Sequence, residues 1–184
     1  MSSATLHKAC KIAPVAAIQT EYSAFVLDVE GPVGTNLLAT CRELGVALVP
    51  YSPLGRGLLT TTFSNNEPIT DEKDMRGTFF PRFQEANRET NVKLVNQFKL
   101  LAEKKGCTTS QLALAWLLKQ GDDIIPIPGT KNIKYLEENW ASLAVRLTDE
   151  DEREIRKFVE TAEIAGERVP PQYLKGILVD TKEE

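Results

Sequence analysis

The sequence predicts an α/β fold in which parallel strands alternate with helices. Continuous apolar runs have the composition of fully buried strands, and they lie at residues 12–19, 46–50 and 123–127. Segments with helical periodicity lie around these runs, at residues 3–11, 36–43, 89–105, 111–119, 133–143 and 148–163. Because strands that alternate with helices form parallel sheets covered by helices, we expect that layered arrangement here.

Local signals mark the ends of the predicted helices. Gly45 stands where a helix end favours glycine, and Thr108 with Gln111 has the spacing of a capping box. Thr148 is expected to cap the last long helix, whose acidic first turn at residues 149–152 suits the positive end of the helix dipole. We therefore interpret this acidic run as a helix start rather than as a metal-binding cluster.

Composition and charge argue against several function classes. The 184-residue chain is 42% hydrophobic and 26% charged, as in ordinary globular domains, and its net charge of -4 gives no electrostatic footprint for nucleic acid. No apolar run is long enough to span a bilayer, and the first residues lack the apolar core of a signal peptide. Three widely separated cysteines suggest neither a disulfide framework nor a zinc site. We expect a soluble cytoplasmic protein without a nucleic-acid or membrane partner.

Polar loops that contain glycine or proline follow the three predicted strands. Ligands of parallel α/β folds bind at the carboxyl ends of the strands, so the site is expected in these loops. The third loop places Gly129, Thr130 and Lys131 directly before a helix, where backbone N–H groups and the helix dipole favour a phosphate. An ordinary strand-to-helix turn explains the same residues equally well. The polar segment 60–88 is expected to be an irregular loop over the site, and an irregular tail begins at residue 170.

Three parallel strands do not close a sheet. They leave two unpaired edges, which soluble proteins avoid. The chain is therefore expected to be part of a larger barrel or sheet, or to complete itself with another copy by self-association through its exposed sheet edges.

Four matches, in the same order, resemble the aldo-keto reductase family. They lie at residues 17–23 (AIQTEYS), 51–59 (YSPLGRGLL), 111–116 (QLALAW) and 125–139, which begins IPIPGTK and ends YLEEN. The resemblance covers about residues 4–173 of the chain. It implies a single domain at residues 1–184, folded as a partial TIM (β/α)8 barrel of the last three βα units with the C-terminal helix and tail. The family's catalytic Asp, Tyr, Lys and His belong to earlier strands, so the resemblance implies no catalytic residue in this chain, and no metal site is expected.

The resemblance implies an NADP-dependent oxidoreductase that reduces aldehydes and ketones by hydride transfer, here as the part that carries the cofactor-binding half. The expected cofactor is NADP, and the expected partner is a small-molecule carbonyl substrate. Two alternatives stay open, a catalytically inactive truncated homologue and a non-catalytic regulatory subunit. His7, the only histidine, is not expected to act in catalysis, since no serine or acid is placed to pair with it.

The resemblance also implies which positions contact the cofactor. Gln19 would hold the nicotinamide carboxamide, since an amide both donates and accepts, and Tyr51 would stack on the nicotinamide ring. The positions expected on the pyrophosphate side are Ser52, Pro53, Leu54, Arg56 and Gly57. Ile127 and Pro128 are also expected to contact the cofactor. The positions expected at the adenosine 2′-phosphate and the adenine are Gly129, Thr130, Lys131, Glu138 and Asn139. Asn132 departs from the Arg that close relatives often carry, which weakens the expected preference for NADPH over NADH.

Several of these residues have a simpler interpretation. Without the resemblance, Gln19 could cap a strand end, Tyr51 could be a core aromatic residue, and Arg56 could be a solvated charge. Lys134 and Glu138 are four residues apart, which is typical of a pair on a helix surface.

Overall fold

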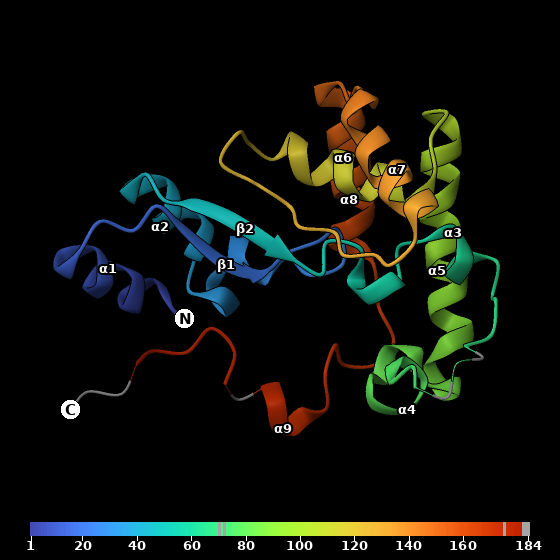
Figure 1. Ribbon diagram of the computed structural model, residues 1–184, viewed down its shortest axis with the longest axis horizontal. Helices are drawn as coiled ribbons and strands as arrows, with labels where there is room; N and C mark the ends of the chain where they lie inside the picture. The colour runs from blue at the N-terminus through green and yellow to red at the C-terminus, as the bar shows by residue number, and fades with distance from the viewer. Residues whose placement is uncertain (70, 72, 175, 182–184) are drawn as a thin grey trace.

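The computed structural model describes residues 1–69, 71, 73–174 and 176–181 (Figure 1). Two strands, β1 (Ala17–Glu21) and β2 (Ala47–Tyr51), form a parallel sheet, with α2 (Leu37–Leu44) against β2 and α1 (Ser3–Ile12) against α2. A second group of helices follows β2 and comprises α3 (Thr61–Ser64), α5 (Glu85–Lys104), α6 (Thr109–Lys119), α7 (Ile133–Ala141) and α8 (Asp149–Thr161). Of two further single-turn helices, α9 (Pro171–Leu174) lies below the sheet in this view, and α4 (Arg76–Phe79) lies beside the lower end of α5.

The sheet confirms the parallel arrangement but contains two strands rather than three. The predicted third strand, residues 123–127, makes a single parallel bridge, between Ile124 and Leu48. Beyond this bridge, Ile127 N donates a hydrogen bond to Pro50 O at 3.1 Å. Pro50 has no N–H, so it cannot donate the next hydrogen bond of a parallel ladder to this segment. Proline within β2 thus explains why this segment lies beside the sheet without forming a regular strand.

The first predicted strand was placed too early. Residues 12–19 were expected to be extended, but α1 continues to Ile12, whose side chain is 86% exposed. Ala13 ends the helix in an extended conformation, as expected for a residue that precedes proline. Pro14 therefore sets the boundary between helix and strand, and β1 begins only at Ala17.

The predicted caps are confirmed where the sequence signals were strongest. Gly45 ends α2 with a φ of 65°, and Thr108 with Gln111 forms a complete capping box at the start of α6. Thr148 and Asp151 form a second capping box at α8, so the acidic run is a helix start. Among the described residues, no group of three or more His, Cys, Asp or Glu side chains could hold a metal ion.

Helix α6 is the centre of the helical group. All its residues from Thr109 to Leu117 except Gln111 are buried, as its almost uniformly apolar sequence predicts. The Trp116 ring meets the Tyr22 ring edge-on, with centroids 5.9 Å apart, which joins this helix to the segment after β1. The core is therefore continuous between the sheet and the helices.

The segment at residues 60–88 has more structure than predicted. It contains α3 and α4, and a T-shaped contact between Phe63 and Phe83, with ring centroids 5.5 Å apart, anchors it. The tail likewise contains α9, while its last residues, 182–184, lie outside the described part of the chain. None of the described helices is long and apolar enough to cross a membrane.

An ion pair at the start of α8 gives the fold a predictable acid sensitivity. Lys105 Nζ lies 2.7 Å from Asp151 Oδ2, and Thr148 also donates to this carboxylate through its backbone and hydroxyl. These bonds, with that of Lys105 the strongest, lower the pKa of Asp151 from 3.8 to about 2. Because the ionised form is favoured in the folded state, its stabilising effect is complete above the ordinary pKa and is lost as the pH falls toward 2.

Lys105→Met is expected to lower the free energy of unfolding by about 0.5–1 kcal/mol near neutral pH. Below about pH 2 it should cost nothing, because Asp151 is then protonated in both proteins. Urea denaturation at the two pH values measures the difference, and Lys93→Met, which removes an exposed pair with Glu89, is the matched control. A cost that persists in acid would show that Lys105 stabilises the fold by packing rather than by charge.

Candidate functional site

The loop after β2, residues 52–57, turns sharply at the carboxyl end of the sheet. Its residues with positive φ are Ser52 (50°), Gly55 (57°), Arg56 (59°) and Gly57 (99°). Only glycine readily adopts a left-handed backbone conformation, so the backbone is strained at Ser52 and Arg56. A Cβ atom on Gly57 would lie 2.5 Å from Nη1 of Arg76, so a side chain there would displace this flexible guanidinium, while the positive φ is what favours glycine.

A second loop, residues 128–131, leads into α7. Asn132 caps this helix, because its side-chain oxygen accepts a hydrogen bond from Lys134 N at 3.0 Å. The Thr130 hydroxyl accepts a bond from Asn132 N at 3.1 Å, which fixes the turn. A Cβ atom on Gly129 would meet nothing within 4 Å, so the backbone there is open to a ligand. The predicted helix start is present, and Asn132 already accepts a hydrogen bond from one of its N–H donors.

Helices α6 and α7 supply the wall opposite these loops. The Thr108 hydroxyl donates to the Glu138 carboxylate at 2.6 Å, so Glu138 is bonded to α6 rather than to Lys134, contrary to the predicted surface pair. Ser110 and Asn139 are both buried, with 4% and 8% of their surface exposed. Within the described part of the chain, no hydrogen bond forms to the Ser110 hydroxyl or to the Asn139 amide, so both are available to a ligand.

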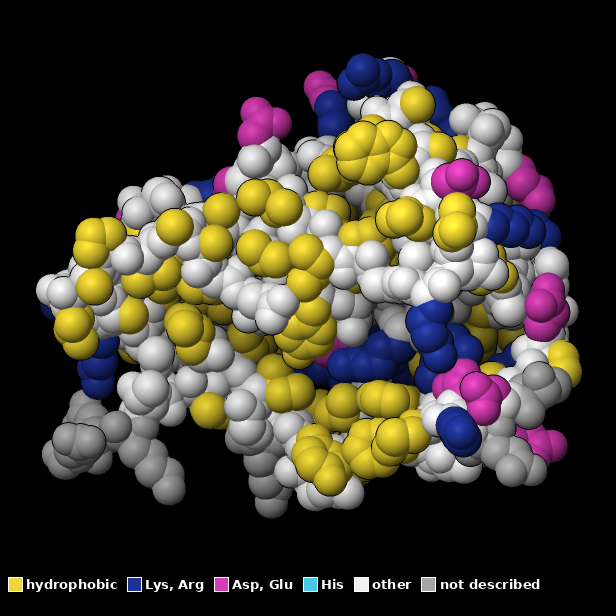
Figure 2. Space-filling view, viewed as in Figure 1, with side chains coloured by type: hydrophobic (Ala, Val, Ile, Leu, Met, Phe, Trp, Pro, Cys, Tyr) yellow, Lys and Arg dark blue, Asp and Glu magenta, His cyan; other side chains and the backbone are white. Residues whose placement is uncertain are grey.

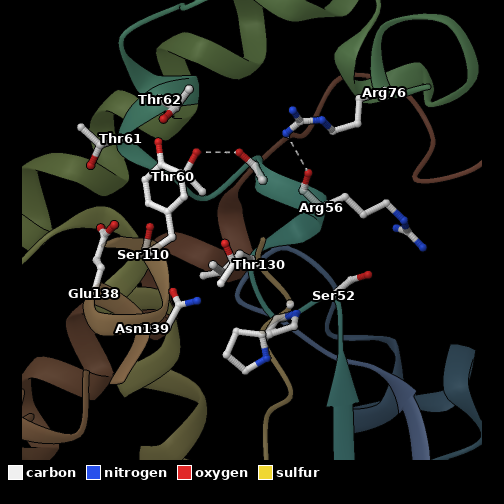
Figure 3. Close-up of a pocket in the computed structure, with 16 residues that line it drawn as sticks. Ser52, Arg56, Thr60, Thr61, Thr62, Arg76, Ser110, Thr130, Glu138 and Asn139 are labelled. Carbon is white, nitrogen blue, oxygen red and sulfur yellow. Dashed lines mark hydrogen bonds between the residues drawn. The ribbon is translucent and has the colours of Figure 1, made fainter. Parts of the chain in front are cut away.

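The two loops and α7 border a cavity of about 540 Å³ at the carboxyl end of β2 (Figure 3). The predicted cofactor positions that line it are Ser52, Pro53, Leu54, Arg56, Gly57, Pro128, Gly129, Thr130, Glu138 and Asn139. These positions come from three separate stretches of sequence. The structure therefore brings together most of the residues that the resemblance singled out.

The remaining predicted positions lie outside this cavity. Gln19 and Tyr51 are on one face of the sheet, because the register pairs Gln19 with Val49 and Glu21 with Tyr51. This face is open, so Gln19 is exposed and Tyr51 is half-buried. Ile127 is 43% exposed, and Lys131 is exposed on the second loop.

Sequence reasoning missed part of the cavity lining. Hydroxyl groups from segment 60–62 and the guanidinium of Arg76 also face it, and Figure 3 shows Arg76 reaching toward the backbone oxygen of Arg56. Asp74 holds Arg76 through paired hydrogen bonds of 2.6–3.0 Å, and this contact lowers the pKa of Asp74. The run Thr60-Thr61-Thr62 was a visible signal for polar lining, whereas nothing in the sequence connects Arg76 with β2.

Glu21 is a further residue whose importance the sequence did not reveal. Its side chain is 3% exposed, and one carboxylate oxygen lies 2.7 Å from Arg56 Nη1. The other oxygen has no hydrogen-bond partner among the described residues, and Arg168 Nε lies 3.8 Å from it. Burial, followed by the negative charge of Glu21, raises the pKa of Tyr51.

This ion pair directs the Arg56 side chain away from the cavity, as Figure 3 shows. The Arg168 guanidinium in turn lies 2.7 Å from Asp28, which ties the tail to the segment after β1. Figure 2 shows basic side chains gathered in a hollow between the strand ends and the segment that carries α4. The carboxyl end of the sheet therefore gathers arginine side chains that are paired with carboxylates, of which that of Glu21 is buried.

The chemistry of the cavity is that of a binding site. Proline and leucine side chains and the Tyr135 ring offer apolar contacts, while hydroxyl groups and the Asn139 amide offer hydrogen bonds. The described lining contains no histidine, cysteine or lysine, so it offers no evident nucleophile with a base beside it. The arrangement suits a ligand that combines a flat ring with polar or anionic groups.

Comparison with known proteins identifies the family of this chain. The model of the aldo/keto reductase family matches residues 1–160. The chain belongs to the aldo/keto reductase family. Aldo-keto reductase yakc (NADP+) of Schizosaccharomyces pombe is 43% identical over 180 residues, and aldo-keto reductase str7 of Strobilurus tenacellus is 44% identical over 182 residues.

The aldo-keto reductase chain is much shorter than these relatives. The matches cover 98% and 99% of this chain but only 52% and 53% of the two relatives. Among solved structures, the glycerol dehydrogenase AKR11B4 of Gluconobacter oxydans matches with a TM-score of 0.72 and 25% identity, over 86% of this chain and 46% of its own. A thermostable aldo-keto reductase, Tm1743, matches with a TM-score of 0.60 at 23% identity, over the same shares of the two chains. The chain thus has an α/β fold with a two-stranded parallel sheet, and aldo-keto reductases are among its structural neighbours.

Proposed function

We propose that this chain binds NADP(H) and forms the cofactor-binding part of an aldo-keto reductase that acts on small carbonyl compounds. The main support is the cavity, whose lining includes residues of both predicted cofactor loops and of α7. The yakc relative is named as an NADP+ enzyme, which supports the choice of cofactor. The proposal concerns binding by this chain, and carbonyl reduction by the whole protein.

The adenosine end of the cofactor fits the residues that are present. The buried Asn139 amide and Ser110 hydroxyl suit the polar edge of adenine, and both groups would gain a hydrogen-bond partner when it binds. Gly129 leaves the backbone before α7 open to the 2′-phosphate, and Lys131 supplies a nearby positive charge. Because Asn132 is neutral and uses its oxygen as a helix cap, we expect only a moderate preference for NADPH over NADH.

The nicotinamide end is proposed to rest on the open face of the sheet. The bound nicotinamide would supply the hydride that reduces the carbonyl carbon. Gln19 would orient the ring through its carboxamide, and the half-buried Tyr51 would give it a flat surface. The Tyr51 phenol is neutral at ordinary pH even without the rise in its pKa, and a neutral ring suits a stacking role.

Saturating NADPH is expected to stabilise the purified chain by about 2.7 kcal/mol at a concentration of 100 times the dissociation constant. Thermal unfolding with and without NADPH measures this effect. Asn139→Ala should weaken NADPH binding by about tenfold, the equivalent of one hydrogen bond in a buried site. Asn65→Ala removes an exposed amide outside the cavity and is the matched control.

No shift with NADPH in a protein that unfolds cooperatively would contradict the proposal. An equal shift in the Asn139→Ala variant would place the cofactor elsewhere on the chain. NADPH oxidation with a carbonyl compound is not expected from this chain alone, since the family's catalytic tetrad has no counterpart in it, and observed turnover would overturn that part of the proposal.

A further inference from the structure

A second cavity, of about 480 Å³, lies between the segment after β1 and the tail after α8. Its volume lies within the range of about 300–1,000 Å³ that is usual for small-molecule sites. Its lining comes from residues 24–28, from the end of α8, from the tail up to residue 178, and from Val33 and Arg82. It shares no lining residue with the cavity at the end of β2, so it is a separate candidate site.

Most of the wall of this second cavity is apolar and fixed in position. Phe25, after β1, and Leu178, in the tail, are both buried and both belong to the hydrophobic core. The tail passes below the sheet toward α1 (Figure 1), and its end is held there because Thr181 N donates a hydrogen bond to the Thr5 hydroxyl oxygen at 3.0 Å. The cavity is therefore formed in the absence of a ligand, and its wall suits an apolar chain.

Arg82 places a positive charge in this apolar wall. Among the residues that the structure describes, its guanidinium forms no ion pair and donates hydrogen bonds to the backbone oxygens of Phe25 and Gly166 alone. Both bonds are 3.4 Å long, beyond the usual range for N–H donors, and a guanidinium carries more donors than these two bonds use. The half-buried Arg82 side chain therefore retains donors for a ligand in the cavity.

The charges around Arg82 favour a ligand with a single negative charge. The carboxylates of Glu21 and Asp28 are already paired with other arginines, and that of Glu167 is exposed, so solvent screens it. These three carboxylates would repel a dianion such as a phosphate ester, whereas a carboxylate matches the planar fork of one guanidinium. We propose that this cavity binds a carboxylate with an apolar chain, such as a medium-chain fatty acid, and that Arg82 is its counterion. The inference does not depend on NADP(H) binding.

Isothermal titration calorimetry of the purified chain with octanoate and with 1-octanol tests this proposal. We expect octanoate to bind about tenfold or more tightly than 1-octanol, because only the carboxylate gains charge-assisted hydrogen bonds from Arg82. Arg82→Met keeps a long apolar side chain and should remove the difference between the two compounds. Arg146→Met is the matched control, because it removes an exposed arginine outside the cavity and should leave both affinities unchanged.

Ala162→Phe is a second variant, which fills the cavity from the end of α8 and should weaken the binding of both compounds. The thermal transition of each variant shows whether it is folded. Equal binding of octanoate and 1-octanol by the unchanged chain, or octanoate binding that the folded variants leave unaltered, would overturn the proposal. Displacement of octanoate by NADPH would also overturn it, because octanoate would then lie in the other cavity. A chain that binds octanoate but not NADPH would contradict the proposed function alone.

Discussion

Trp116→Ala is expected to lower the free energy of unfolding by about 3–5 kcal/mol, the range for removal of a large aromatic side chain from a core. Trp116 has no exposed surface and contacts the Tyr22 ring edge-on. Its other face covers the Arg156 guanidinium, whose central carbon lies 4.8 Å from the ring centroid. Truncation would therefore remove apolar contacts and a cation–π contact together.

The same truncation would also open a buried polar network to water. Arg156 forms ion pairs with Glu30 and Glu152, and the Tyr22 hydroxyl donates a hydrogen bond to Glu30. These polar groups form one network next to the Trp116 ring. Urea denaturation monitored by far-UV circular dichroism measures the cost. Trp140→Ala is the matched control, because this tryptophan is 74% exposed and its loss should change stability by no more than about 0.5 kcal/mol. Similar losses for the two variants would mean that α6 is not the centre of the core.

The predictions that succeeded from sequence rest on short-range signals. The capping boxes at Thr108 and Thr148 and the end of α2 at Gly45 depend on residues within one helical turn, so the local sequence determines them. The burial of α6 follows in the same way from its composition. The strand boundaries were harder, because Pro14 and Pro50 act through a missing N–H or a restricted neighbour rather than through hydrophobicity.

In the candidate site, too, the residues that could be predicted are those that belong to local sequence motifs. Residues of the two loops could be predicted because they stand in motifs that resemble the family. Arg76 and Glu21 could not, because what they contact lies far away in the sequence: Arg76 bonds to the backbone of Arg56, and Glu21 pairs with Arg56 and lies beside Arg168. These contacts form through tertiary packing, which no local pattern in a single sequence encodes.

Glu21→Gln is expected to destabilise the fold by about 3 kcal/mol, the lower end of the range for breaking a buried ion pair by removing one partner. Glutamine keeps the shape of the side chain and one acceptor, but it leaves Arg56 without a countercharge and Arg168 with Asp28 alone. Arg82 adds to the imbalance, because burial lowers the pKa of this guanidinium while the charge of Glu21 opposes that change. The cost should therefore come from uncompensated positive charge at the carboxyl end of the sheet.

Glu89→Gln is the control for this change, because it breaks a pair in which the Lys93 and Glu89 side chains are 73% and 83% exposed. Solvent screens such pairs, so the control should change the free energy of unfolding very little. Urea denaturation in low and high salt separates the two cases, since salt weakens the exposed pair and leaves most of the effect of Glu21 in place. A loss below about 1 kcal/mol for Glu21→Gln would mean that water reaches the Arg56 pair and that Glu21 does not hold this arginine in position.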